Sequence, residues 1–166
     1  MKTASIKAVF RSLHEADVRY IVVGGLAVIE HGFLRQTKDI DLVIELEPTN
    51  IIRGLEALQR LGYSPRVPVQ PAQFADSEMR ETWIREKGML VLNLFSDAHL
   101  ETPVDVFVRH PFDFTNEFEQ SLTEQIDGDI PVHFVSLPTL LKLKAEAGRP
   151  HDLVDIDQLR LREEEP

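Results

Sequence analysis

Residues 21–44 read IVVGGLAVIEHGFLRQTKDIDLVI, and this stretch decides the fold. It opens with a short β-branched run that ends in Gly24-Gly25, and it closes with Asp39-Ile40-Asp41 inside a second apolar run. In a strand over 39–44, side chains at positions i and i+2 point to the same side of the sheet, so both carboxylates project together. In a helix the two acids would lie roughly 200° apart. The strand interpretation therefore gives Asp39 and Asp41 a shared function.

The rest of the chain predicts a sheet flanked by helices. Apolar periodicity and Pro, Gly and Ser boundaries predict helices over 3–16, 26–31, 48–62, 111–120, 136–147 and from Pro150 onward, and strands over 18–23, 39–44, 63–69, 89–95, 104–108 and 130–135. The strands over 89–95 and 104–108 are expected to pair as an antiparallel hairpin. Residues 74–87 are read either as a short helix or as a lid-like insertion, so the role of segment 64–88 stays open.

This order of elements predicts an α+β fold with a mixed α/β sheet. At 166 residues, we expect a single domain over 1–166, with a core over 18–135 and C-terminal helices over 136–166. The charged N-terminus predicts no signal peptide, and no apolar run is long enough to cross a membrane. A cytoplasmic location is the resulting expectation. The net charge of −10 argues against broad nucleic-acid binding, and the absence of cysteine excludes thiolate metal sites.

Three carboxylates on predicted strands are the candidate metal ligands: Asp39, Asp41 and Asp105. A buried carboxylate needs a partner, and three acids near one strand end suit a hard divalent cation such as Mg²⁺. Gly24 and Gly25 predict a tight strand-to-helix turn whose backbone N–H groups and positive dipole favour phosphate. Acids for metal and glycines for phosphate together suggest phosphoryl or nucleotidyl transfer.

These motifs resemble the nucleotidyltransferase superfamily typified by DNA polymerase β. The family signature is a hydrophobic residue, Gly-Gly or Gly-Ser, a spacer and Asp-x-Asp, followed by a later strand with one acid. Here it reads Val23-Gly24-Gly25, Asp39-Ile40-Asp41 and Asp105. The resemblance implies the nucleotidyltransferase fold. It also implies that Asp39 and Asp41 hold two Mg²⁺ ions (Mn²⁺ is the alternative) with the nucleotide phosphates, and that Asp105 orients or deprotonates the attacking hydroxyl.

A closer resemblance is to small bacterial members of this superfamily that are related to abortive-infection and toxin–antitoxin nucleotidyltransferases. Two further blocks carry it, R-x-T-x-D-I-D-L over 35–42 and K-x-x-A-G-R-P-x-D-x-x-D over 144–155. The candidate nucleotide-binding residues are Gly24, Gly25, Arg35, Thr37, Lys38 and Lys144. Arg35 and Lys38 are equally consistent with solvated loop charges.

Lys144 follows Leu137, Leu140 and Leu141 at helical spacing, so it is expected on the inward face of its helix. A lysine there contacts either a triphosphate or one of two acids, Asp152 and Asp155. Trp83 is read as core, with base stacking as the less favoured alternative. The six histidines show no metal-ligand spacing, and His31 is expected to cap a short helix.

The function that these residues predict is Mg²⁺-dependent transfer of NMP from an NTP to an acceptor hydroxyl on a protein, an RNA end or a small molecule. The alternative is a catalytically silent or regulatory toxin–antitoxin component on the same fold, with a cognate antitoxin or other partner protein. A metal-dependent phosphohydrolase is a weaker third reading. Retention of Asp39, Asp41 and Asp105 disfavours the silent alternative.

Overall fold

Strands form one mixed sheet in the part of the chain that the computed structural model describes, residues 1–164. The sheet order is β3-β4-β5-β2-β1-β7-β6, with parallel pairs β2–β5 and β1–β7 and antiparallel pairs elsewhere. The strands are β1 Tyr20–Val23, β2 Ile40–Ile44, β3 Ser64–Pro65, β4 Val91–Phe95, β5 Val104–Phe107, β6 Leu122–Ile126 and β7 Ile130–Phe134. The α+β prediction is confirmed.

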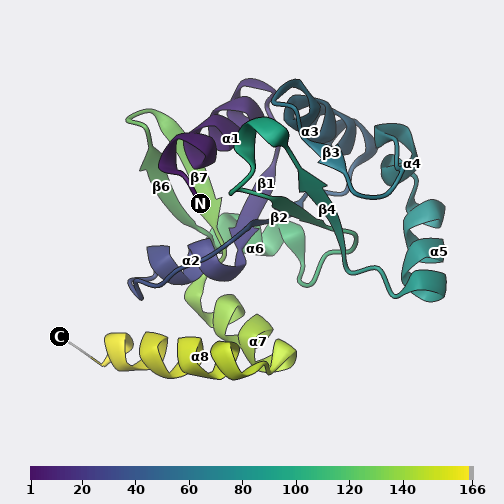
Figure 1. Cartoon of the computed structure of the whole chain (residues 1–166). Helices are drawn as coiled ribbons and strands as arrows, with labels where there is room; N and C mark the ends of the chain where they lie inside the picture. The colour runs from purple at the N-terminus through teal and green to yellow at the C-terminus, as the bar shows by residue number, and fades with distance from the viewer. Residues whose placement is uncertain (165–166) are drawn as a thin grey trace.

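Helices flank both faces of the sheet (Figure 1). They are α1 Thr3–Glu15, α2 Gly24–Glu30, α3 Pro48–Arg60, α4 Pro71–Ala75, α5 Ser77–Lys87, α6 Phe114–Gln120, α7 Leu137–Ala147 and α8 Pro150–Glu163. Helices α1 and α3 contact each other and the sheet, while α2 contacts β1, β2 and α7, and α8 packs on α7. No helix within residues 1–164 combines the length and apolar composition that a membrane crossing requires.

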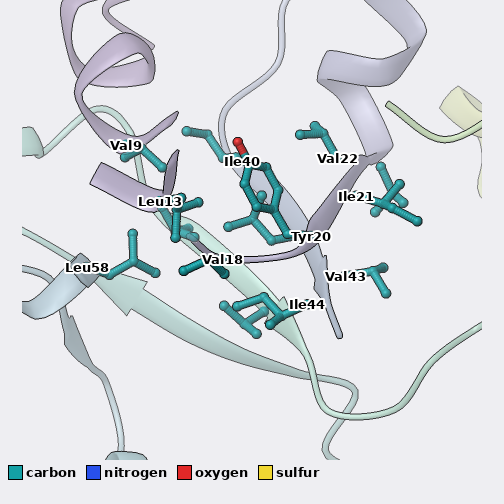
Figure 2. Packing of buried hydrophobic residues seen from close by; sticks show 14 of the residues in the cluster. Val9, Leu13, Val18, Tyr20, Ile21, Val22, Ile40, Val43, Ile44 and Leu58 are labelled. Carbon is teal, nitrogen blue, oxygen red and sulfur yellow. The ribbon is translucent and has the colours of Figure 1, made fainter. Parts of the chain in front are cut away.

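Successive side chains of β2 point to opposite faces of the sheet, and this separates the core residues of the strand from its acid. Its even-numbered residues Ile40, Leu42 and Ile44 are fully buried. Ile44 faces α3, because a Cβ added at Gly54 of that helix would meet its side chain at 3.3 Å. Figure 2 shows this core, to which α1 and α3 contribute Val9, Leu13 and Leu58. The period of two then places Asp41 on the opposite face.

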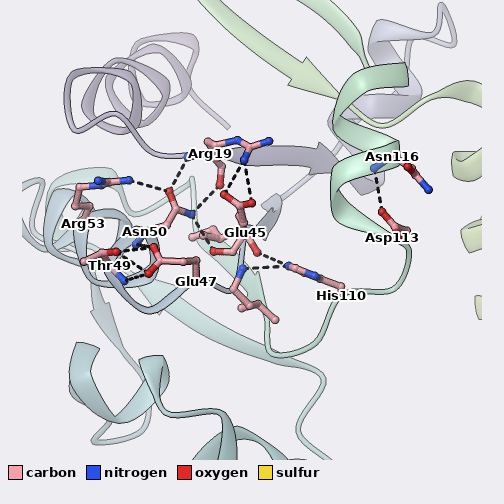
Figure 3. Close-up of polar contacts among 11 residues, drawn as sticks. Arg19, Glu45, Glu47, Thr49, Asn50, Arg53, His110, Asp113 and Asn116 are labelled. Carbon is pink, nitrogen blue, oxygen red and sulfur yellow. Dashed lines mark hydrogen bonds and ion pairs between the residues drawn. The ribbon is translucent and has the colours of Figure 1, made fainter.

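A buried asparagine ties the start of α3 to the far ends of β1 and β2 (Figure 3). The Asn50 amide donates to the carbonyls of Arg19 and Glu45 at 3.0 and 2.9 Å, and its Oδ1 accepts from the Arg19 backbone N–H at 2.9 Å. Asn50 is only 2% exposed, so these three bonds satisfy groups that would otherwise be buried without partners. The network fixes the ends of β1 and β2 that lie away from the acids.

Several predicted boundaries are wrong. Helix α2 begins at Gly24 itself rather than after a separate turn, with Gly24 at φ +65° as its first residue. The predicted edge strand over 63–69 shrinks to Ser64–Pro65, because proline removes ladder donors. The ambiguous segment 74–87 is helical, divided into α4 and α5 where Asp76 caps α5.

Strand β6, Leu122–Ile126, was not predicted. It pairs with β7 across the Asp127-Gly128 turn, and its three central residues are exposed. Such a strand has little apolar alternation to reveal it in the sequence. The antiparallel hairpin of β4 and β5 is confirmed.

Candidate functional site

One row of residues crosses four strands of the sheet and carries two of the acids. The registers pair Val23 of β1 with Asp41 of β2, Asp41 with Asp105 of β5, and Asp105 with Asn93 of β4. Asp39 lies just before β2, two residues from Asp41 and on the same side. The pairing of β2 with β5 therefore brings acids that are distant in the sequence to adjacent positions.

The three acids form a compact cluster. One carboxylate oxygen each from Asp39, Asp41 and Asp105 lies within 4.8 Å of the others, and all three residues are partly exposed. We call these three residues the acidic cluster. Its donors are all hard oxygen ligands, the set that Mg²⁺ and Mn²⁺ prefer over soft-ligand metals. The geometry therefore fits a divalent cation.

The carboxylates of the acidic cluster are partly desolvated and repel one another. Burial, followed by the charges of Asp39 and Asp105, raises the pKa of Asp41 to about 7. Burial and the charge of Asp39 also raise the pKa of Asp105, against a hydrogen bond from Asn93 that lowers it. Like charges in a partly desolvated site raise one another's pKa, and a cation among them reverses the effect.

Gly24 and Gly25 make room for side chains of the site. A Cβ on Gly24 would overlap the Asp41 carboxylate, and a Cβ on Gly25 would overlap the Thr37 hydroxyl. Gly24 also has φ +65°, a conformation that L-residues with side chains rarely adopt. The glycine pair therefore lets Asp41 and Thr37 lie directly against the start of α2, a steric role that the phosphate interpretation did not include.

Arg35 and Lys38 differ in their environments although they lie three residues apart. The Arg35 guanidinium is bound to the Asp155 carboxylate, with Nε 2.8 Å from Oδ1, and its side chain is 23% exposed. Arg35 is therefore not the solvated loop charge that one reading expected. Lys38 is exposed, lines the cavity beside the acids, and makes no ion pair with any other residue in 1–164.

Lys144 lies between two buried acids. Its Nζ is 2.9 Å from Asp152 Oδ1 and 2.8 Å from Asp155 Oδ2, and its side chain is only 6% exposed. The inward orientation that the helical period predicted is confirmed, and of its two proposed partners the acids are the ones in contact. Lys144 also lines the cavity.

Sequence reasoning assigned no role to Arg149, which follows the Gly148 end of α7. Its Nε is 2.7 Å from Asp152 Oδ2, yet its side chain remains 62% exposed at the cavity. The charges of Asp41 and Asp39 act on it, which places it within electrostatic range of the acidic cluster. Arg149 lay inside the quoted C-terminal block, but only the fold reveals that it faces the acids. We call Arg35, Lys144, Arg149, Asp152 and Asp155 the ion-pair cluster.

The two clusters border one cavity of about 850 Å³. Part of its wall is apolar and comes from α7 and from the hairpin of β4 and β5: Leu90, Val91, Phe107, Leu140, Leu143 and Ala147. The cavity therefore combines a charged region with an apolar wall.

Two other predicted candidates lie outside this cavity. Trp83 is buried, with its ring 6.4 Å from that of Phe74, so its assignment to the core is confirmed. His31 is the C-cap residue of α2, as predicted, and its Nε2 lies 2.8 Å from the Val135 carbonyl.

Comparisons with known proteins identify a family and related folds. The family described as "Nucleotidyltransferase of unknown function (DUF6036)" matches residues 3–164. None of the curated proteins matches the chain. Among solved structures, lincosamide antibiotic adenylyltransferase LnuA in a lincomycin-bound crystal form has TM-score 0.58 at 15% identity, covering 89% of each chain. An antigenic nucleotidyltransferase-like protein from Paracoccidioides brasiliensis has TM-score 0.54 at 16% identity, covering 95% of this chain and 74% of that one. At these identities the two structures show a shared fold.

Proposed function

The chain belongs to this family of nucleotidyltransferases, and from that premise we propose that it transfers NMP from an NTP to an acceptor hydroxyl in a Mg²⁺-dependent reaction. The observation that carries the proposal is the acidic cluster, in which three carboxylate oxygens lie within 4.8 Å of one another and none of the acids is in an ion pair with the other residues of 1–164. Its position beside a cavity of about 850 Å³ supports a bound nucleotide.

Asp39 and Asp41 would hold Mg²⁺, with Mn²⁺ as the substitute, and Asp105 would complete the ligand set. When bound, the ion neutralises charge on the phosphate oxygens and polarises the reacting phosphoryl group. The raised pKa of Asp41 supports this assignment, because deprotonated carboxylates in such a group are stabilised by a cation.

Asp105 would orient the acceptor hydroxyl and accept its proton. The acceptor oxygen then bonds to the α-phosphorus, the bond from that phosphorus to the bridging oxygen breaks, and pyrophosphate leaves. Lys38 and Arg149 are the exposed cations beside the acids, so they would bind the triphosphate. Gly24, Gly25, Arg35, Thr37 and Lys144 would shape that same side of the cavity, with Arg35 and Lys144 acting through the ion-pair cluster.

The test is label transfer from α-³²P NTPs in the presence of Mg²⁺ or Mn²⁺. Acceptor pools of RNA with free 3′ ends, proteins and small-molecule alcohols are supplied separately. We expect transfer to one pool by the wild type and none by Asp39→Ala or Asp41→Ala. Asp157→Ala is the matched control, since Asp157 is an exposed aspartate on α8 outside both clusters. A wild type that neither transfers label nor binds NTP with a divalent ion would overturn the proposal in favour of a regulatory role.

A further inference from the structure

Asp105 is held by a neighbour on the next strand. Asn93 stands opposite Asp105 in the register of β4 and β5, and its side-chain amide donates a hydrogen bond to Asp105 Oδ1. Both residues are partly buried. One hydrogen bond therefore holds Asp105 Oδ1, and Oδ2 has no hydrogen-bond or ion-pair partner among residues 1–164.

Asn93 is in turn oriented by Arg66, which follows β3. Arg66 Nε donates to Asn93 Oδ1, and the Arg66 backbone N–H donates to the Asn93 carbonyl at 3.1 Å. The guanidinium also lies over the Phe95 ring, 5.2 Å from its centroid. These contacts hold an otherwise exposed side chain in one position.

The chemistry of these groups fixes the direction of the amide. A guanidinium can only donate hydrogen bonds and an ionised carboxylate can only accept them. An asparagine between the two must therefore turn its oxygen toward Arg66 and its NH₂ toward Asp105. The chain of contacts transmits an orientation from the edge of the sheet to the acidic cluster.

We infer that Asn93 and Arg66 are positioning residues that fix the Asp105 carboxylate so that Oδ2 faces the acceptor hydroxyl. This inference rests on the proposed nucleotidyl transfer. Residues that orient the ligands of a metal site commonly change metal affinity or activity about 10–100-fold when they are removed.

A purely structural role for Asn93 would be redundant. Backbone pairing already joins β4 to β5 from Val91↔Phe107 to Leu94↔Val104. The Asn93 side chain adds one bond on the face that carries the acids, and that bond ends on Asp105 rather than on backbone. Its removal is therefore expected to affect Asp105 more than the hairpin.

The kinetic test uses Asn93→Ala, Arg66→Ala and the double variant. We expect kcat to fall about tenfold in Asn93→Ala and about threefold in Arg66→Ala, with KM for NTP changed less than about twofold. The double variant should lose less than the product of the two single effects, because Arg66 acts partly through Asn93 and partly through the direct effect of its charge on Asp105. Asn116→Ala and Arg85→Ala, two exposed residues elsewhere, should leave kcat unchanged. Unchanged kcat in Asn93→Ala, or additive effects, would overturn the inference.

A second readout does not depend on transfer. In NMR spectra, the side-chain amide protons of Asn93 should shift in Asp105→Ala and in Arg66→Ala, while Asn116 should not respond. Amide shifts in both variants alongside a wild type without transfer would keep Asn93 in place beside Asp105 but reject the proposed function. If the amide shifts in neither variant, the positioning inference fails even where transfer is observed.

Discussion

Two groups of carboxylates border the same cavity and have opposite electrostatics. In the acidic cluster, burial and neighbouring acids raise the pKa of Asp41 to about 7. In the ion-pair cluster, Asp152 is fully buried, yet hydrogen bonds from Arg149 and Lys144 outweigh its desolvation and lower its pKa to about 2. The pKa values in the two groups differ because of the cations that surround the carboxylates, and not because of burial alone.

Each charged side chain of the ion-pair cluster contacts a side chain of opposite charge in the same cluster. Lys144 contacts both of its acids, Arg35 contacts Asp155 and Arg149 contacts Asp152, so three cations serve two anions. The acidic cluster has three anions, and none of them is in an ion pair with the other residues of 1–164. The carboxylates of the ion-pair cluster therefore join α7 to α8, whereas the carboxylates of the acidic cluster are available to a ligand.

The largest expected effect concerns activity and comes from the acidic cluster. Asp41→Asn removes a charged ligand of the divalent cation that would neutralise charge on the phosphate oxygens, an effect worth several kcal/mol. We expect transfer to fall about a thousandfold or more. We also expect stability without metal to stay equal or rise, because one of three repelling charges is lost. Label transfer and urea unfolding in a chelator measure the two effects.

The control for that experiment is Asp152→Asn in the ion-pair cluster. It should lower stability, because it leaves Lys144 and Arg149 with less compensation. If Asp41→Asn and Asp152→Asn change stability in the same direction, the contrast between the two clusters is wrong.

The next effect concerns stability and comes from Lys144. Lys144→Met leaves two buried carboxylates without their shared cation, which typically costs about 3–5 kcal/mol. Lys142→Met on the same helix is the matched control, because Lys142 is exposed and such substitutions stay within about 0.5 kcal/mol. Urea unfolding measures both. A loss below about 1 kcal/mol in Lys144→Met would mean that the ion pairs do not stabilise the packing of α8.

The sequence pattern could reveal the site residues whose orientation depends on one strand or one helix. The period of two in β2 predicted the shared side of Asp39 and Asp41, and the helical period predicted that Lys144 faces inward. Asp105 was visible as one acid in an apolar strand. In each case the signal lies within a few residues, because backbone geometry alone sets the side to which a side chain points.

The contacts that local pattern could not reveal join distant segments. Arg35 and Asp155 are 120 residues apart, and the chain from Arg66 through Asn93 to Asp105 crosses three strands. Which cation meets which acid depends on strand order and register, and neither is encoded in a single strand. For the same reason the sequence left the partner of Lys144 open.

The pH dependence of stability should separate the two clusters in the protein without metal. The raised pKa of Asp41 means that the folded state keeps a proton that the unfolded state has released above about pH 4. The contribution of Asp41 to stability should therefore fall as the pH rises from about 4 to about 7, by at most about 1.4 kcal/mol per pH unit.

Asp152 should act in the opposite direction in a lower range. Its pKa of about 2 means that its stabilisation is complete above about pH 4 and is lost as the pH falls toward 2. Unfolding free energies across pH 2–8 test both limbs. Asp41→Asn should flatten the upper limb and Asp152→Asn the lower one, whereas an Asp41→Asn profile parallel to the wild type would contradict the assignment.

The smallest expected effect concerns Arg149, the member of the ion-pair cluster that remains largely exposed. Its single acid contact leaves other guanidinium N–H groups for a triphosphate, but solvent screens an exposed charge, so about 1 kcal/mol is the expected contribution. Arg149→Ala should weaken NTP binding about fivefold, as measured by calorimetry with Ca²⁺ so that no transfer occurs. Arg149→Lys should recover part of this affinity, because the charge remains while the planar guanidinium geometry is lost. Arg160→Ala, at an exposed position later on α8, is the control. If Arg149→Ala binds NTP as tightly as the control, Arg149 has only a structural role in the ion-pair cluster, and Lys38 is the exposed cation that binds the triphosphate.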